Sequence, residues 1–211
     1  MSRWEPNARG RLEQAALALY GERGFEKTTV AEIAARAGLT ERTFFRHFAD
    51  KREVLFWGAG ALQELLVGAV ASAPDAAAPI EAVVAALETT GAIFEQRREL
   101  ARQRQSIIAA NTELQERELI KLATLASALA GALRRRGVGE PDARHAAEAG
   151  IAVFRVAFDR WIADANGQDF PQFVREALDR LRAVTGGAWP PVGVASPTAE
   201  PAAVTTAVRA G

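Results

Sequence analysis

The sequence predicts an all-α protein, and three observations support this class. Apolar residues recur at spacings of three and four along most of residues 7–185, proline and glycine are scarce in that range, and β-branched runs are nearly absent. With 211 residues, the chain is long enough for one small and one larger unit. We expect about nine helices, with short ones first and longer ones after them.

Composition and charge exclude several classes of protein. There is no cysteine, and His47 and His145 are the two histidines, so we expect no disulfide, thiolate nucleophile or metal site. A phosphate-binding glycine loop and a Ser-His-Asp arrangement are also missing, so we expect neither an enzyme nor a cofactor. The formal net charge is zero, so nucleic-acid binding would need a local motif.

The sequence also indicates where the protein acts. No stretch approaches the roughly 20 apolar residues that cross a bilayer, and residues 1–6 lack the apolar core of a signal peptide. We therefore expect a cytoplasmic protein without a membrane partner.

The first elements have clear start and stop signals. Apolar positions predict a first helix over residues 12–20. Thr29 and Glu32 form a capping box that starts a second helix, which Gly38 ends. Thr40 can then cap a third helix.

The remaining elements are longer. Asp50 and Glu53 predict the start of a fourth helix that runs to about residue 69, and Thr112 and Gln115 predict a second capping box. From residue 186 the chain is rich in Pro, Ala, Val and Thr, and we expect a disordered tail over 186–211. The other predicted helices span about 80–97, 99–110, 112–136, 141–165 and 170–185.

Residues 29–48, TVAEIAARAGLTERTFFRHF, have the order helix, glycine turn, helix. Ile33, Leu39, Phe44 and Phe48 would form a small core, and the second helix would present polar and basic side chains that suit the major groove. Residues 1–53 hold ten Lys/Arg and eight Asp/Glu, a net charge of +2, so binding would depend on how charge is arranged. The alternative is a helical hairpin that only packs. The residues facing outward or along the rim are Thr40, Glu41, Arg42, Thr43, Phe45, Arg46 and His47.

Residues 24–55, GFEKTTVAEIAARAGLTERTFFRHFADKREVL, resemble the signature of the TetR family of repressors. The resemblance implies a DNA-binding domain over 1–52 and a ligand-binding and dimerisation domain over 53–185. It implies that Thr29 and Lys51 contact phosphates, the lysine from a helix N-terminus. It also implies groove contacts by Thr40, Arg42, Thr43 and His47. The family commonly has tyrosine where this chain has Phe45, which removes one phosphate contact.

One short recognition helix covers few base pairs, so a two-fold dimer that reads a palindrome is expected. The last two helices are the candidate interface, because small residues permit close approach and aromatic residues supply buried area. The alternative is that these stripes are intramolecular core. The candidate interface residues are Ala147, Gly150, Ile151, Phe154, Phe158, Phe173, Leu178 and Leu181.

Residues 97–121 place arginines beside an apolar stripe, which would suit a ligand that is anionic at one end and apolar at the other. The alternative is a solvated face of local ion pairs. Residues 102–118, RQRQSIIAANTELQERE, are similar to the C-terminal domain of a TetR subgroup that includes the mycofactocin-system regulator, which implies an acyl-CoA ligand. The candidate ligand residues are Trp57, Phe94, Arg102, Arg104, Ile107, Asn111, Leu122, Phe154 and Trp161.

These expectations combine into one function. The chain is predicted to be a ligand-responsive repressor that binds a palindromic operator as a homodimer and is released by a small amphipathic effector, with long-chain acyl-CoA as the candidate. The alternatives are an activator and an effector-independent DNA-binding protein of the same fold. The helix that starts at Asp50 is expected to carry the response, because it would hold both Lys51 and the apolar face of residues 57–66.

Overall fold

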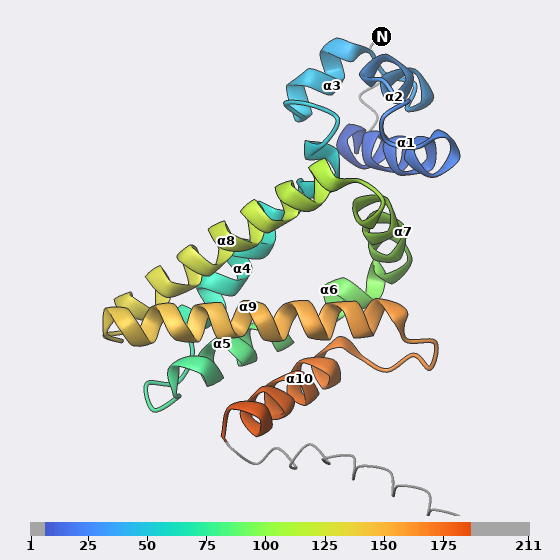
Figure 1. The fold of residues 1–211 in the computed structure, drawn as a ribbon. Helices are drawn as coiled ribbons and strands as arrows, with labels where there is room; N and C mark the ends of the chain where they lie inside the picture. Colours follow the sequence, from blue (N-terminus) through green and yellow to red (C-terminus); the bar gives the residue numbers. More distant parts are fainter. Residues whose placement is uncertain (1–6, 187–211) are drawn as a thin grey trace, which may run out of the picture.

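A computed structural model describes residues 7–186 of the protein. Within that range the chain forms ten α-helices and one 3₁₀ helix, without strands, so the predicted all-α class is confirmed (Figure 1). The predicted tail lies outside the described residues, apart from Gly186. The elements of the N-terminal half are α1 (Ala8–Arg23), α2 (Val30–Arg36), α3 (Glu41–His47), η1 (Glu53–Phe56), α4 (Ala59–Ala71) and α5 (Pro79–Glu88). Those of the C-terminal half are α6 (Gly91–Gln96), α7 (Arg98–Ala109), α8 (Thr112–Arg135), α9 (Glu140–Ala163) and α10 (Phe170–Thr185).

Side-chain caps start the two short helices α2 and α3 as the sequence predicts. The Thr29 hydroxyl accepts a hydrogen bond from the Glu32 amide over 3.3 Å, and the Glu32 carboxylate accepts one from the Thr29 amide over 2.9 Å. The Thr40 hydroxyl accepts from the Thr43 amide over 3.2 Å. Each cap satisfies backbone donors that the first turn of a helix leaves unpaired.

The second predicted capping box, at Thr112, is wrong. The residue at the cap position of α8 is Asn111, and its side chain donates to the Ile107 carbonyl over 2.6 Å instead of accepting from α8. The Gln115 side chain also turns back, and donates to the Ala109 carbonyl over 2.8 Å. Both amides therefore satisfy the C-terminal end of α7, where free carbonyl groups need donors.

Two predicted helices are divided in the structure, which raises the number of helices above the expected nine. The Asp50 carboxylate accepts from the amides of Arg52 and Glu53 over 2.8 and 3.0 Å, but the turn that it starts is the 3₁₀ helix η1, and α4 begins at Ala59. The helix expected over 80–97 breaks between α5 and α6. There the hydroxyls of Thr89 and Thr90 donate to backbone carbonyls three residues earlier, a local bond that competes with helix continuation.

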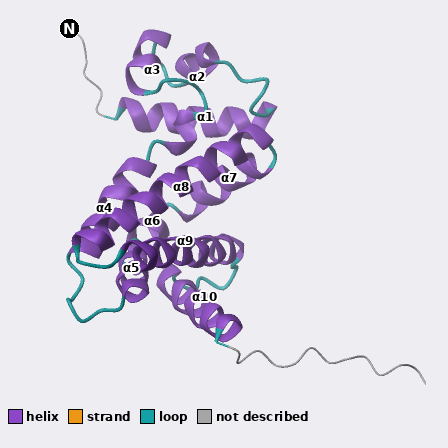
Figure 2. Cartoon of the chain, turned by 60° about the vertical axis from the view of Figure 1, so that its left-hand side comes forward, coloured by secondary structure: helices purple, strands orange, loops and turns teal. Residues whose placement is uncertain are grey.

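The helices surround two hydrophobic cores. The larger one joins α4, α5, α8, α9 and α10, and the smaller one joins α1, α2 and α3 with η1. Figure 2 shows α1–α3 at one end of the molecule and α9 and α10 toward the other. The smaller core also includes Ile107, Ile108 and Leu114 of α7 and α8, so the predicted DNA-binding unit rests directly on the second unit. The boundary at residue 52 stays a prediction.

One segment differs from the expectation that no stretch could span a bilayer. Glu53–Ala71 contains 19 residues with a mean hydropathy of 1.6, which meets the length and composition of a membrane helix. In the fold this segment is η1 followed by α4. Its Leu66 and Val70 are fully buried in the larger core, and Glu53 forms ion pairs with α8. These contacts make the segment part of the packed helical unit.

Candidate functional site

The helix-turn-helix is held by a tight backbone turn between α2 and α3. Gly38 adopts a φ of 65°, in the left-handed region that favours glycine. The amides of Gly38 and Leu39 donate to the carbonyls of Ala35 and Ala34 over 2.9 and 2.8 Å. Arg11 of α1 also donates to the Ala37 carbonyl, so α1 braces the turn.

The outer face of α3 carries cations without partners among the described residues. Arg42 and Arg46 are exposed and form no ion pair or hydrogen bond there. By contrast, Arg23 and Arg36 in the same unit pair with glutamates, each over 2.6 Å. Phe45 lies between the two arginines in sequence and is 55% exposed. This face therefore offers guanidinium donors and an apolar ring to an external ligand.

The other predicted groove residues on α3 are less exposed. Thr40 is exposed and Thr43 is half-buried. Their hydroxyl oxygens lie 3.1 Å apart, so the two side chains share a hydrogen bond. His47 is half-buried, and its Nε2 is buried without a hydrogen-bond partner within the described residues. Burial, and then the charges of Arg46 and Arg9, lower the pKa of His47, which keeps the ring neutral at pH 7.

The two predicted phosphate ligands are engaged within the protein. The Thr29 hydroxyl is used in its capping box, where it also donates to Glu32 over 2.9 Å. The Lys51 ammonium donates to the carbonyls of Phe25, Glu26 and Thr28 over 2.9, 3.3 and 3.0 Å, and lies 4.4 Å from the centre of the Phe25 ring. An ammonium group has three donors, so this arrangement uses all of them. Their phosphate contacts stay predictions.

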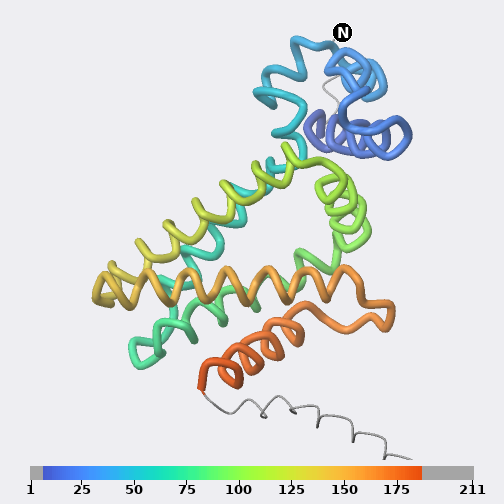
Figure 3. Tube along the Cα trace, viewed as in Figure 1, coloured from blue at the N-terminus to red at the C-terminus, as the bar shows by residue number. Residues whose placement is uncertain are grey.

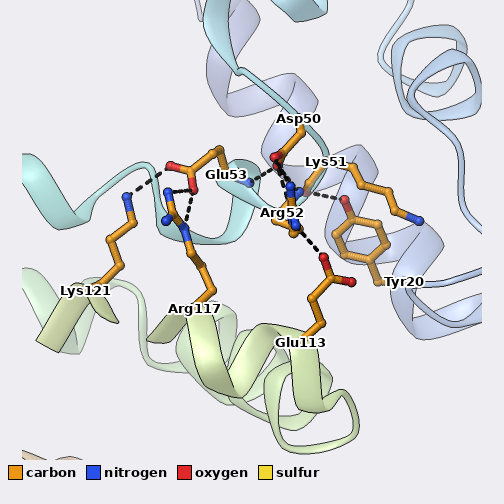
Figure 4. Close-up of polar contacts among 8 residues, drawn as sticks. All are labelled: Tyr20, Asp50, Lys51, Arg52, Glu53, Glu113, Arg117 and Lys121. Carbon is orange, nitrogen blue, oxygen red and sulfur yellow. Dashed lines mark hydrogen bonds and ion pairs between the residues drawn. The ribbon is translucent and has the colours of Figure 1, made fainter. Parts of the chain in front are cut away.

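The link between the two units, residues 50–56, is bound to the first turns of α8 (Figures 3 and 4). Arg52 pairs with Asp50 over 2.7 Å and with Glu113 over 2.5 Å. Glu53 pairs with Arg117 over 2.6 Å and with Lys121 over 3.1 Å.

Two groups beside this link have shifted pKa values. Burial alone would raise the pKa of Glu53, but hydrogen bonds from Arg117 and Lys121 outweigh it and lower the pKa. On the other side, the Tyr20 hydroxyl donates to the Lys51 carbonyl over 2.7 Å. Burial, followed by the charge of Asp50, raises the pKa of Tyr20, so the phenol stays protonated as the donor.

Helix α7 joins the two units on the other side of the link. Arg104 donates from Nε to the Leu55 carbonyl over 2.7 Å, and its Nη1 pairs with Glu118 of α8 over 3.1 Å. Gln103 donates to the Leu17 carbonyl of α1 over 3.1 Å. Most contacts of α7 and of the link join residues far apart in the chain, such as Arg104 with Leu55 and Arg117 with Glu53, and so could not be predicted from local patterns.

The predicted ligand residues fall into three groups: side chains bound to other parts of the protein, an aromatic cluster, and a pair at a surface depression. In the first group, Arg102 donates to the carbonyls of Ile162 and Asp164, each over 2.6 Å, and thereby caps the end of α9. Trp57 lies between Arg9 and Arg97, whose guanidinium carbons are 5.6 and 5.4 Å from its ring centre. These side chains and Arg104 therefore bind other parts of the protein.

The second group forms an aromatic cluster. Phe94 of α6 has its ring centre 6.2 Å from Phe154 and 5.8 Å from Trp161, and Phe158 and Phe170 complete the cluster. Trp161 is fully buried and donates from Nε1 to Glu95 over 2.6 Å. The structure thus brings three predicted ligand residues together. Leu122 of α8 packs half-buried against the same core.

Ile107 and Asn111 line a shallow surface depression between α1 and α7. Its other wall comes from Tyr20, Gly24 and Phe25. A second depression lies beside the helix-turn-helix turn, between Arg11, Gln14, Ala15, Ala18, Arg36, Ala37 and Gly38. Neither depression includes the aromatic cluster.

Most of the predicted interface residues are packed inside one chain. A Cβ atom on Gly150 would lie 2.3 Å from Cγ1 of Val83, so this glycine permits the close approach of α5 to α9. The intramolecular alternative therefore describes these stripes in the monomer, and a dimer through α9 and α10 would use their outer faces. The buried members are Ala147, Gly150, Ile151, Phe154, Phe173 and Leu178, and the half-buried members are Phe158 and Leu181.

Sequence comparison finds relatives for both units. Residues 13–56 match the model of the bacterial regulatory proteins of the tetR family, and residues 77–186 match the MftR C-terminal domain. The transcriptional regulator TcmR of Streptomyces glaucescens is 39% identical over 75 residues, 36% of this chain and 33% of TcmR. The transcriptional repressor KstR2 of Mycobacterium tuberculosis is 43% identical over 47 residues, 22% of this chain and 24% of KstR2. The aligned part thus spans a third or less of these relatives.

Solved structures share the fold over most of the chain. The SmeT–triclosan complex has a TM-score of 0.60 at 23% identity, covering 92% of this chain and 99% of that one; SmeT is a repressor from Stenotrophomonas maltophilia. FadR of Bacillus subtilis, in complex with stearoyl-CoA, has a TM-score of 0.58 at 19% identity, covering 82% and 96%. Because the MftR-type model covers more than half of the chain and the tetR model covers its helix-turn-helix, the protein belongs to the TetR family of transcriptional regulators, which are DNA-binding proteins rather than enzymes.

Proposed function

We propose that this regulator is a cytoplasmic, homodimeric repressor that binds a palindromic operator through α3 and leaves it when a small amphipathic effector binds. The observation that carries the proposal is the outer face of α3, where Arg42 and Arg46 are exposed and unpaired within the described residues while neighbouring arginines are neutralised. Unpaired guanidinium groups on a helix of this kind suit guanine edges and phosphates.

A dimer follows from the size of the recognition surface. The helix α3 spans only seven residues, so one copy reads a few base pairs. Two copies related by a two-fold axis would place their recognition helices one helical turn apart, about 34–36 Å, and would read a palindrome. The outer faces of α9 and α10 are the proposed contact, since their inner faces are used within the chain.

The proposed effector site lies along half-buried apolar side chains that pack against the larger core. They come from five helices, α4, α6, α7, α8 and α9, and apolar side chains of this kind suit the apolar body of an amphipathic ligand. Long-chain acyl-CoA is the first candidate, since FadR of Bacillus subtilis, which shares this fold, binds stearoyl-CoA in its solved structure. Arg102 and Arg104 are the candidate partners of its phosphates, although part of each guanidinium already binds a backbone carbonyl. These side chains are Leu62, Phe94, Ala101, Leu122, Phe158 and Ile162.

Selection of binding sites from a random pool of duplex DNA tests the proposal. The full chain should enrich a palindrome, and the complex should contain two chains for each site. Addition of stearoyl-CoA should release the DNA, whereas free coenzyme A should not. A palindrome that stearoyl-CoA does not release would remove the acyl-CoA candidate and leave the repressor. Absence of any enriched sequence would contradict specific DNA recognition.

A further inference from the structure

Arg104 occupies a position between the two units of the protein. It comes from α7, and its guanidinium reaches two elements at once: Nε donates to the Leu55 carbonyl in η1, and Nη1 pairs with Glu118 of α8. Its guanidinium carbon also lies 5.0 Å from the centre of the Phe56 ring. The planar fork of an arginine can hold two partners in fixed directions, which the point charge of a lysine cannot do.

The Arg104 pair is better shielded from solvent than the Arg52 pair of the link, as is the pair of Glu53 with Lys121. The Arg104 side chain is 26% exposed and that of Glu118 24%, whereas Arg52 and Glu113 are 43% and 48% exposed. Ion pairs in the open are screened by water and salt, and those that are shielded hold their geometry more firmly. The Glu118 carboxylate is also fixed by the Gln105 side chain over 3.5 Å.

On the link, Arg104 binds a backbone atom, the Leu55 carbonyl, so the contact fixes the path of the chain there. Leu55 is 6% exposed and belongs to the same core as α1, α2 and α3. The Leu55 carbonyl is thus fixed to the helix-turn-helix, while Glu118 stands on α8 between Leu114 of the smaller core and Leu122 beside the larger one. We propose that Arg104 is a positioning residue that sets the orientation of the helix-turn-helix on the second unit, and so sets the spacing of the two α3 helices in the dimer.

This inference rests on the proposed function, because spacing has meaning only for a dimer on a two-part operator. Arg104 contacts no DNA in this account, so its loss should leave recognition of one half-site intact. What should change is how strictly the protein requires a given distance between half-sites. Inserting one base pair moves a half-site by about 3.4 Å and rotates it by about a tenth of a turn.

The test measures affinity for the selected palindrome and for the same palindrome with one base pair inserted or deleted at its centre. The unchanged protein should strongly prefer the original spacing. Arg104→Met should lose at least about fivefold of that preference, the lower end of typical coupling between sites. Arg104→Lys should recover only part of it, and binding to a single half-site should not change. Arg134→Met removes an exposed pair with Glu140 within the larger unit and should retain the full preference.

Glu118→Gln offers a second variant in case Arg104→Met does not fold, and it should also weaken the preference for spacing. Full preference in both variants would overturn the inference while leaving the repressor in place. Failure of the unchanged protein to bind any palindrome would instead overturn the proposed function, and the role of Arg104 with it.

Discussion

The Lys51 ammonium donates a hydrogen bond to the Thr28 carbonyl over 3.0 Å, so the lysine that follows the helix-turn-helix closes the loop that precedes it. Two further carbonyls of the same loop accept from this ammonium. The loop ends at the capping box of α2. Lys51 therefore holds the first helix of the motif in place from the far end of the domain.

Replacing Lys51 with methionine should lower the free energy of unfolding by about 1.5–3 kcal/mol, the range for hydrogen bonds to a charged group. Urea unfolding of the two proteins measures the difference. Lys27→Met is the matched control, because Lys27 is exposed in the same loop and should change stability little. If stability were unchanged and binding to all DNA sequences weaker, Lys51 would contact DNA phosphates and would not stabilise the loop.

Gly38→Ala should destabilise the protein by about 1–2 kcal/mol, because a side chain disfavours the left-handed backbone that this turn requires. A Cβ atom would also lie 2.8 Å from the Arg11 guanidinium that braces the turn. Thermal unfolding and DNA binding should both report the change. A variant with the stability and affinity of the unchanged protein would refute this account of the turn.

Gly150→Ala should cost about 1–3 kcal/mol of folding stability, because the added methyl group overlaps Val83 across a packed helix contact. Gly68→Ala is the matched control on α4, where nothing lies within 4 Å of the new atom, and alanine there should stabilise by about 0.5–1 kcal/mol. If Gly150→Ala instead left unfolding unchanged and abolished the dimer, the glycine would belong to the interface between copies.

The Glu53 ion pairs should make stability depend on pH. Because its pKa in the folded protein lies below the ordinary 4.5, its contribution is fully present above that value and is lost as pH falls through the lower value. Glu53→Gln should therefore be less stable than the unchanged protein at pH 7, and the difference should shrink below about pH 4.5. Glu116→Gln, at an exposed position on α8, should show no such trend. A difference that stayed constant with pH would contradict the role of these pairs.

The helix-turn-helix could be predicted because its signals are local. Thr29 and Glu32 stand three positions apart and specify the start of α2. Gly38 specifies the left-handed backbone of the turn that follows it. The divided helix after Pro79 was missed for a related reason. Apolar spacing continues across Thr89 and Thr90, and only the hydroxyl contacts reveal the break.

The role of the arginines could not be predicted in this way. The sequence left an anionic ligand and local ion pairs as the possible partners of Arg102 and Arg104, but each also donates to a backbone carbonyl, 60 and 49 residues away. Every residue carries a backbone carbonyl, so no sequence pattern marks which carbonyl will accept the hydrogen bond. The partner of the apolar stripe of α9 could not be predicted either. A periodic pattern indicates burial but not which surface covers it, and Gly150 in fact packs against Val83 of the same chain.

The proposed recognition of bases by Arg42 of α3 can be isolated in a single comparison of affinities. Affinity should be measured for the selected palindrome and for random duplex of equal length, at one salt concentration, with the unchanged protein and with Arg42→Ala. Arg42→Ala should lose about 1–3 kcal/mol of binding free energy on the palindrome and much less on random DNA. Equal losses on both would contradict base recognition by Arg42.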